Sequence, residues 1–134
     1  MPDAFLDRNV IVSAVVMTGA YFAFLGHRND LLGHHLAGFG ATLLLLCMLA
    51  VVRGGRLTWD ALAVTVAAIG IGFVTESSIF RFAFFDPVDF ANQSLGACIA
   101  CACVIETRPD RSAIRRLSVA GAVLLLGGFV FAFG

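Results

Sequence analysis

Five long apolar stretches constrain the fold of this chain more than any other feature of its sequence. They cover about residues 9–26, 35–52, 58–80, 88–105 and 117–133. A helix needs roughly 20 apolar residues, and at least about 17, to cross the ~30 Å hydrocarbon core of a bilayer. The stretches are continuous, whereas a half-buried strand alternates apolar and polar residues. The sequence therefore predicts an all-α polytopic membrane helix bundle in a single domain, with about five transmembrane helices.

The composition agrees with a lipid environment. The 134 residues are 60% hydrophobic and 13% charged, whereas soluble domains are about 45–50% apolar and about 25% charged. The formal net charge is zero, so there is no general basic field that would attract nucleic acid. Two aspartates and a single arginine, Arg8, precede the first apolar stretch. A secretory signal has a basic region there, and we therefore expect this stretch to be a retained helix.

The nine basic side chains, all arginine, are divided unevenly between the two sides of such a bundle. If each stretch crosses in turn, only Arg28 and Arg81 fall on the side away from the N-terminus. The other side receives Arg8, Arg53, Arg56, Arg108, Arg111, Arg115 and Arg116. Cytoplasmic loops of membrane proteins carry the excess of basic residues. We therefore expect a multi-pass protein of a bacterial-type cytoplasmic (inner) membrane, with a cytoplasmic N-terminus and a non-cytoplasmic C-terminus.

Small residues indicate how the helices pack. In lipid no hydrophobic effect drives helices together, so their packing depends on the close approach that small side chains allow. The fourth stretch contains Gly96 and Ala100 one turn apart and almost no bulky side chains. This predicts that the fourth helix is central. The run of leucines at 43–46 predicts that the second helix faces lipid over part of its surface. The glycines of the last stretch, at 121, 127 and 128, predict a contact with another helix or another subunit.

Cys98 and Cys101 form a C-x-x-C pattern within the fourth stretch. As thiolates they are candidate ligands for a soft metal, or a redox pair. Cysteine also serves as a small apolar residue in tightly packed helices, and burial in lipid opposes thiolate chemistry. The second interpretation is favoured, so we expect no metal and no cofactor.

His34 and His35 are adjacent, so on a helix their side chains point about 100° apart. Only one of them can face the centre of the bundle. The remaining histidine, His27, lies beside the same loop. A haem held by two histidines of different helices is therefore disfavoured. The open alternatives are a proton relay and polar residues at the membrane interface.

Glu76 is the carboxylate placed deepest in an apolar stretch. Counted from Asp60, it lies about 24 Å along a crossing of about 30 Å, close to the outer rim. Arg81, five residues on, is poorly placed to pair with it along a helix. The threading instead brings other polar side chains to the same side. The candidate substrate- or ion-binding residues are Glu76, Arg81, His34, His35, Asp86 and Asp89.

Two roles for Glu76 remain open at this stage. Ionisable residues within a membrane are costly and usually functional, so Glu76 could titrate in step with proton or cation movement. It could instead anchor the phenylalanine-rich segment that follows. Whether residues 81–92 continue the third helix or lie along the interface is also open.

Three classes of function fit the sequence. The small size and short tails favour an accessory or assembly subunit of a membrane complex. Glu76 and the polar outer rim favour a small oligomeric permease or channel instead. A membrane enzyme acting on a lipid or quinone needs two converging catalytic groups, which the outer histidines and acids could supply. In each case we expect the lipid bilayer and a homo-oligomer or larger membrane complex as partners, and no nucleic acid.

Overall fold

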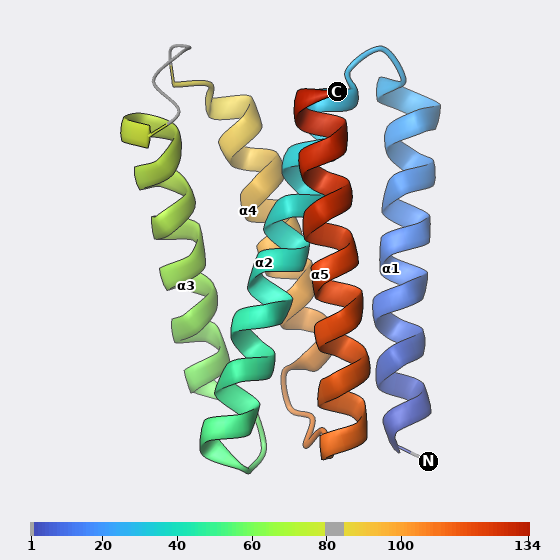
Figure 1. Cartoon of the computed structure of the whole chain (residues 1–134), viewed down its shortest axis with the longest axis vertical. Coiled ribbons are helices and arrows are strands. Elements are labelled where there is room, and N and C mark those ends of the chain that lie inside the picture. The colour runs from blue at the N-terminus through green and yellow to red at the C-terminus, as the bar shows by residue number, and fades with distance from the viewer. Residues whose placement is uncertain (1, 80–84) are drawn as a thin grey trace.

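The computed structural model describes residues 2–79 and 85–134, with side chains described for 6–78 and 85–134. Within these residues the regular secondary structure is entirely helical and there is no strand, which confirms the all-α prediction. The helices run alternately up and down, so the two termini lie at opposite ends (Figure 1). The elements are α1 (Pro2–Leu25), α2 (Asn29–Arg53), α3 (Trp59–Val74), the π-helical turn η1 (Thr75–Ile79), α4 (Pro87–Val104) and α5 (Arg111–Phe133).

Among the described residues, four helical segments are long and apolar enough to cross a membrane. They are Leu6–Leu25, Asn29–Arg53, Trp59–Ser78 and Arg111–Phe133. The fourth predicted crossing corresponds to α4, which has 18 residues and carries Asp89, Asn92 and Gln93 near its start. It lies within the same bundle as the other four helices (Figure 1). The structure therefore supports a membrane helix bundle with four long apolar helices, and α4 is a shorter, more polar fifth member.

Three helices begin nearly two turns earlier than hydropathy predicted, and the first of them begins at Pro2, where residue 9 was expected. The second begins at Asn29, where residue 35 was expected, and the fifth begins at Arg111, where 117 was expected. Asp110 caps α5, because its side chain accepts a hydrogen bond of 2.7 Å from the backbone N–H of Ala113. An N-cap of this kind satisfies backbone donors at a helix start whether or not the next residues are apolar. Hydropathy marks apolar residues and does not register such polar helical turns.

Helix α2 occupies the centre of the bundle, and the prediction that the fourth helix does so is wrong. The side chains of Phe39 and Leu43 are completely buried, and Leu46 is 1% exposed. Leu44 and Leu45 are half-buried, so the leucine run points both inward and outward, and α2 is exposed over part of its surface as predicted. Helix α2 packs along both α5 and α4, whereas α1 and α3 lie at the two edges (Figure 1).

Glycines bring α2 and α5 into backbone contact. A methyl group at Gly33 would overlap the backbone of Ala132, and one at Gly40 would overlap that of Leu125. From the other side, Gly128 lies against Ala37 in the same way. Such small residues allow helices in lipid to gain dispersion contacts along their length. The predicted role of the last stretch in contacting another helix is confirmed for this glycine.

The α2–α4 contact is equally close. A methyl group at Gly38 would overlap the backbone of Gln93, and one at Gly96 would overlap the carbonyl of His35. This is the contact that the small residues of the fourth stretch provide. Because glycines fix α2 against both neighbours, the rotation of α2 about its axis is fixed too. That rotation decides which way His34 and His35 point.

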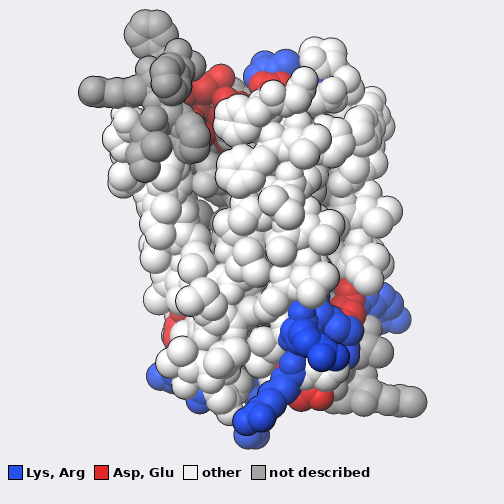
Figure 2. Space-filling view, in the orientation of Figure 1, with Lys and Arg blue, Asp and Glu red and all other residues white. Residues whose placement is uncertain are grey.

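Basic side chains gather at the end of the bundle that holds the N-terminus (Figure 2). Of the described arginines, only Arg28 lies at the other end, between α1 and α2. Acidic side chains at the arginine-rich end form ion pairs with some of the arginines. The pairs are Arg53–Asp60 at 3.1 Å, Arg56–Glu106 at 3.0 Å and Arg116–Asp7 at 2.6 Å.

Candidate functional site

A cavity of about 520 Å³ lies at the end of the bundle opposite the arginines. Helix α2, the α3–η1 segment, α4 and α5 each contribute to its wall. Figure 2 shows acidic side chains gathered at this end of the molecule. We call this cavity the mouth. Its polar lining consists of His34, Thr75, Glu76, Asp89 and Gln93.

His34 lies between two carboxylates that come from different elements. Its Nδ1 is 3.6 Å from Oε1 of Glu76, and its Nε2 is 3.4 Å from Oδ2 of Asp89. The three side chains are 19%, 15% and 18% exposed, so they are largely but not fully withdrawn from solvent. A protonated imidazole has two N–H donors and can serve both carboxylates, whereas a neutral one has a single donor. The three side chains are therefore close enough for a proton to pass between the imidazole and either carboxylate.

Asp89 is placed by the start of α4. Asp86 is the N-cap, and its Oδ1 accepts a hydrogen bond of 2.8 Å from the N–H of Val88. Pro87 is the first helical residue, a position that proline favours because its missing N–H has no partner there in any case. Asp89 then falls in the first turn, where the helix dipole stabilises a negative charge. Its Oδ1 is buried and has no hydrogen-bond partner within the described part of the chain.

Glu76 is placed by the π-helical turn η1, which directly continues α3, so the crossing predicted at 58–80 is one helical segment that ends in a π turn. The Thr75 hydroxyl donates to the carbonyl of Gly72 at 2.9 Å, and the Ser77 hydroxyl donates to Val74 at 3.2 Å. The Ser78 hydroxyl also donates to Val74. A π turn contains an extra residue and turns the following side chains relative to an α-helix. Such turns are frequent at functional sites.

The other predicted site residues have different positions. His35 is completely buried and its ring lies 5.2 Å from Tyr21 and 6.3 Å from Phe39. The prediction that only one of the two histidines faces the centre is confirmed. Asp86 acts as the cap of α4 and does not line the mouth. Arg81 is outside the described residues, so its role stays a prediction.

Cys98 and Cys101 do not share an environment. Cys98 is exposed, whereas Cys101 is 4% exposed and packs in the core. All four cysteines are free thiols. Among the described residues, no three His, Cys, Asp or Glu side chains are arranged to hold a metal ion. Within the described part of the chain, Cys98 and Cys101 therefore have no third side chain that could complete a metal site.

Sequence reasoning missed Gln93 and Thr75, which both line the mouth. Gln93 comes four residues after Asp89, so the two share one face of α4. The amide of Gln93 lies so close to Gly72 that a methyl group there would overlap it. A polar residue one turn inward from an acidic one was a usable signal. Thr75 gave no comparable signal, because its position depends on the π turn.

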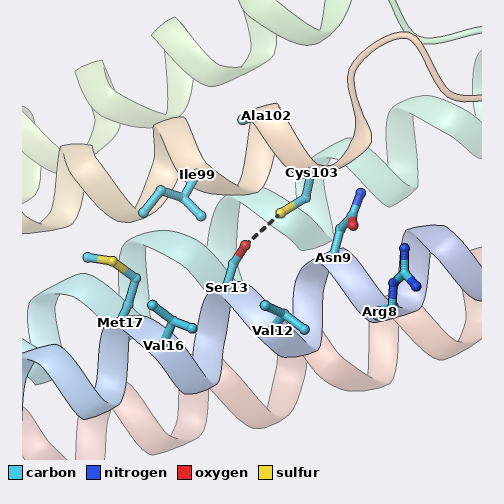
Figure 3. Close-up of a pocket in the computed structure, with 9 residues that line it drawn as sticks. All are labelled: Arg8, Asn9, Val12, Ser13, Val16, Met17, Ile99, Ala102 and Cys103. Carbon is cyan, nitrogen blue, oxygen red and sulfur yellow. Dashed lines mark hydrogen bonds between the residues drawn. The ribbon is translucent and has the colours of Figure 1, made fainter.

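A second cavity, of about 530 Å³, lies between α1 and α4 (Figure 3). Figure 3 shows Arg8 and Asn9 at one end of it and Met17 and Ile99 at the other. Between them the Ser13 hydroxyl lies 3.5 Å from the thiol of Cys103. Apart from this Ser13–Cys103 contact, the polar groups are spaced along the cavity. The mouth, where three titratable groups meet, is therefore the better candidate for function.

Comparison of the chain with protein-family models, curated proteins and solved structures gives no match. A function must in any case be argued from the chemistry of a site, because one fold serves many functions.

Proposed function

We propose that this protein is a small membrane permease that binds a proton or another cation at the mouth. The observation that carries this proposal is the position of His34 between Glu76 and Asp89 in a cavity of an otherwise apolar bundle. Ionisable groups inside a membrane helix bundle are costly, and they usually mark ion pathways or proton relays. With both carboxylates ionised, these three groups carry net negative charge whether or not the imidazole is protonated.

A smaller cavity extends the mouth toward the middle of the bundle and supports a transport role. It has about 80 Å³ and shares Ala41, Ile71 and Gln93 with the mouth. Thr42 and Ala97 line its deeper part, between α2, α3 and α4. The open space therefore continues inward from the charged groups, between small residues and the larger Leu45 and Ile69. Five thin helices enclose little space, so we propose that the permease works as a homo-oligomer.

The proposed setting is a bacterial-type inner membrane, crossed five times with α4 as the fourth crossing. The arginine-rich end would face the cytoplasm, in accordance with the usual excess of basic residues there. The mouth would then open on the non-cytoplasmic side. With 18 residues, α4 is about 27 Å long, close to the thickness of the hydrocarbon core.

The test is proton uptake into proteoliposomes that contain a pH-sensitive dye. We expect Glu76→Gln and Asp89→Asn each to lower the rate at least about tenfold, because each removes a carboxylate from His34. Glu106→Gln is the matched control, since Glu106 is an exposed acid that pairs with Arg56 at the arginine-rich end. Equal rates in all four proteins, each correctly folded by circular dichroism, would contradict the proposal.

An accessory subunit is the second candidate, and one feature of α5 favours it. Gly127 faces open space, because a methyl group at this position would have no neighbouring atom within 4 Å. Another helix can approach closely at such a glycine. Purification in mild detergent distinguishes the candidates. A larger partner that co-purifies, and is lost in a Gly127→Leu variant, would favour the accessory role, and a clean homo-oligomer would oppose it.

The enzyme hypothesis draws on the same histidine, because an imidazole between carboxylates is also suited to general acid–base catalysis. It requires a lipid or quinone to be retained by the purified protein and consumed on incubation. Extraction followed by mass spectrometry tests this directly. The permease proposal instead requires a flux without chemical change of the substrate.

A further inference from the structure

We propose that the mouth binds an organic ammonium ion that carries an aromatic or other bulky apolar group. This inference rests on the proposed function, and it adds the chemical class of the substrate. It is drawn from four features of the mouth: its charge, its apolar wall, its floor and its size.

The charged side of the mouth suits an ammonium ion better than a metal ion. The described His and carboxylate groups are not arranged to ligate a metal, and metal ligands must converge to within about 2.0–2.6 Å of one point. Oδ1 of Asp89 is buried without a hydrogen-bond partner among the described residues. A buried anionic oxygen of this kind is costly unless a positive group compensates it. An ammonium ion can do so over a longer distance and with looser geometry.

The opposite wall is apolar and comes mainly from α5. Leu125, Phe129 and Phe133 line it, and Ile71 of α3 lies on the same cavity. The rings of Phe129 and Phe133 are stacked, with centroids 6.1 Å apart and planes 18° apart. The two residues remain 45% and 70% exposed. Aromatic rings beside carboxylates provide both an apolar surface and a cation–π partner.

The floor of the mouth is made of small residues, so no side chain of the floor fills the space. Gly33, Ala37 and Ala41 lie on α2, and Gly128 and Ala132 lie on α5. These residues serve the close α2–α5 contact, and their shortness leaves the cavity open above it. The cavity is therefore a consequence of the packing and does not depend on a large side chain moving aside.

The size of the mouth favours an organic cation over a bare ion as the ligand. Its volume of about 520 Å³ falls in the range of roughly 300–1,000 Å³ of small-molecule sites. A bare cation would leave most of this volume and the whole phenylalanine wall unused. An ammonium group next to Asp89 and Glu76, with an aromatic ring against Phe129, would use both halves.

Equilibrium dialysis of the full-length protein in detergent tests this inference, with radiolabelled benzyltrimethylammonium chloride as the probe. We expect saturable binding that tetramethylammonium chloride displaces at least about tenfold less well than unlabelled probe. Neopentylbenzene, which has the same shape without the charge, should not displace it. Absence of saturable binding, or equal displacement by the neutral compound, would overturn the inference.

Variants test the carboxylates and the phenylalanine wall of the mouth separately. We expect Glu76→Gln and Asp89→Asn each to weaken binding at least about tenfold, and Phe129→Ala to weaken it several-fold. Phe24→Ala is the matched control for the aromatic change, because Phe24 is an 82% exposed phenylalanine of α1 that does not line the mouth. If all four variants bind the probe as the wild type does, the probe is bound elsewhere and the inference is wrong.

The two proposals can fail separately. If the probe does not bind while Glu76-dependent proton uptake persists, the substrate class is wrong and the permease proposal stands. If the probe binds in a carboxylate-dependent way while no flux of proton or probe is seen, the binding site stands and the permease proposal is wrong. If Glu76→Gln or Asp89→Asn unfolds in detergent, Phe129→Ala still tests the site, because it removes no polar contact.

Discussion

The two sides of α2 differ in how they meet their neighbours. On one side, α5 follows α2 in backbone contact, with Gly33 and Gly40 on α2 and Gly128 on α5. On the other, α3 is joined to α2 at the arginine-rich end, where Arg53 and Asp60 pair at 3.1 Å. Toward the other end α3 and α2 separate (Figure 1), and the mouth lies there. The difference suggests that close packing gives this bundle its stability, whereas divergence gives it room for chemistry.

The largest expected effect comes from breaking the close side with Gly40→Leu. The new side chain would overlap the backbone of Leu125, which cannot move aside as a side chain tip could. We expect a loss of about 3 kcal/mol or more, at the upper end of the cost of overpacking. Thermal unfolding in detergent measures it. Gly127→Leu is the control, because that glycine faces open space, and equal melting temperatures for the two variants would show that the contact is not close.

The next effect comes from filling the open side with Ala41→Leu. Ala41 lines both the mouth and the smaller cavity behind it. We expect benzyltrimethylammonium binding to weaken about tenfold, which corresponds to about 1.4 kcal/mol, with no loss of thermal stability. Ala67→Leu, at an exposed position of α3, should leave binding unchanged. Unaltered binding in Ala41→Leu would mean that the ligand does not occupy this space.

The helix caps allow a finer comparison of the two ends. Asp86→Ala and Asp110→Ala should each cost about 1 kcal/mol of stability, the usual value for an N-cap. Only Asp86→Ala should also weaken probe binding, because it loosens the turn that places Asp89. Asp86→Asn keeps a capping oxygen and should restore both properties. If Asp86→Asn binds the probe as poorly as Asp86→Ala does, the charge of Asp86 matters and its role is more than that of a cap.

The smallest expected effect comes from Arg116→Ala, which removes the ion pair between α5 and α1. Arg116 donates to Asp7 at 2.6 Å, and the two side chains are 45% and 24% exposed. Exposed ion pairs usually contribute about 0–1 kcal/mol, so we expect a stability change below about 1 kcal/mol. A double-mutant cycle with Asp7→Ala isolates the pair. A coupling well above that range would mean that α1 depends on this end for its position.

The sequence predicted the helices well, because a helix that can cross a membrane is marked by a long continuous apolar stretch. It predicted the wrong central helix, for a physical reason. In lipid, a leucine that faces another helix and one that faces acyl chains are equally apolar, so the run at 43–46 could not show which way it points. Gly33, Gly38 and Gly40 were the better signal, since only close helix contact requires them. Alternate crossing of the five stretches correctly anticipated which of the described loops lie at the same end.

The site was predicted in part. Threading alone brought His34, Glu76 and Asp89 to the same end of the bundle, and these three residues do meet. Which of the adjacent histidines would join them could not be predicted, because the rotation of α2 is fixed by glycine contacts with two other helices. The π turn that carries Glu76 was also beyond prediction. It depends on hydroxyl–carbonyl hydrogen bonds that hydropathy does not register.

The convergence of His34, Glu76 and Asp89 at the mouth is the central claim, and thiol cross-linking tests it most directly. In a background without the four native cysteines, His34→Cys is combined with Glu76→Cys or with Asp89→Cys, and a short bifunctional thiol reagent is added. Both pairs should cross-link within one chain. A separate chain that combines His34→Cys with Cys103, the other three native cysteines being removed, should not cross-link, because Cys103 lies 14 residues, or about 21 Å, along α4 from Asp89. Cross-linking of the Cys103 pair in preference to the other two would contradict the account.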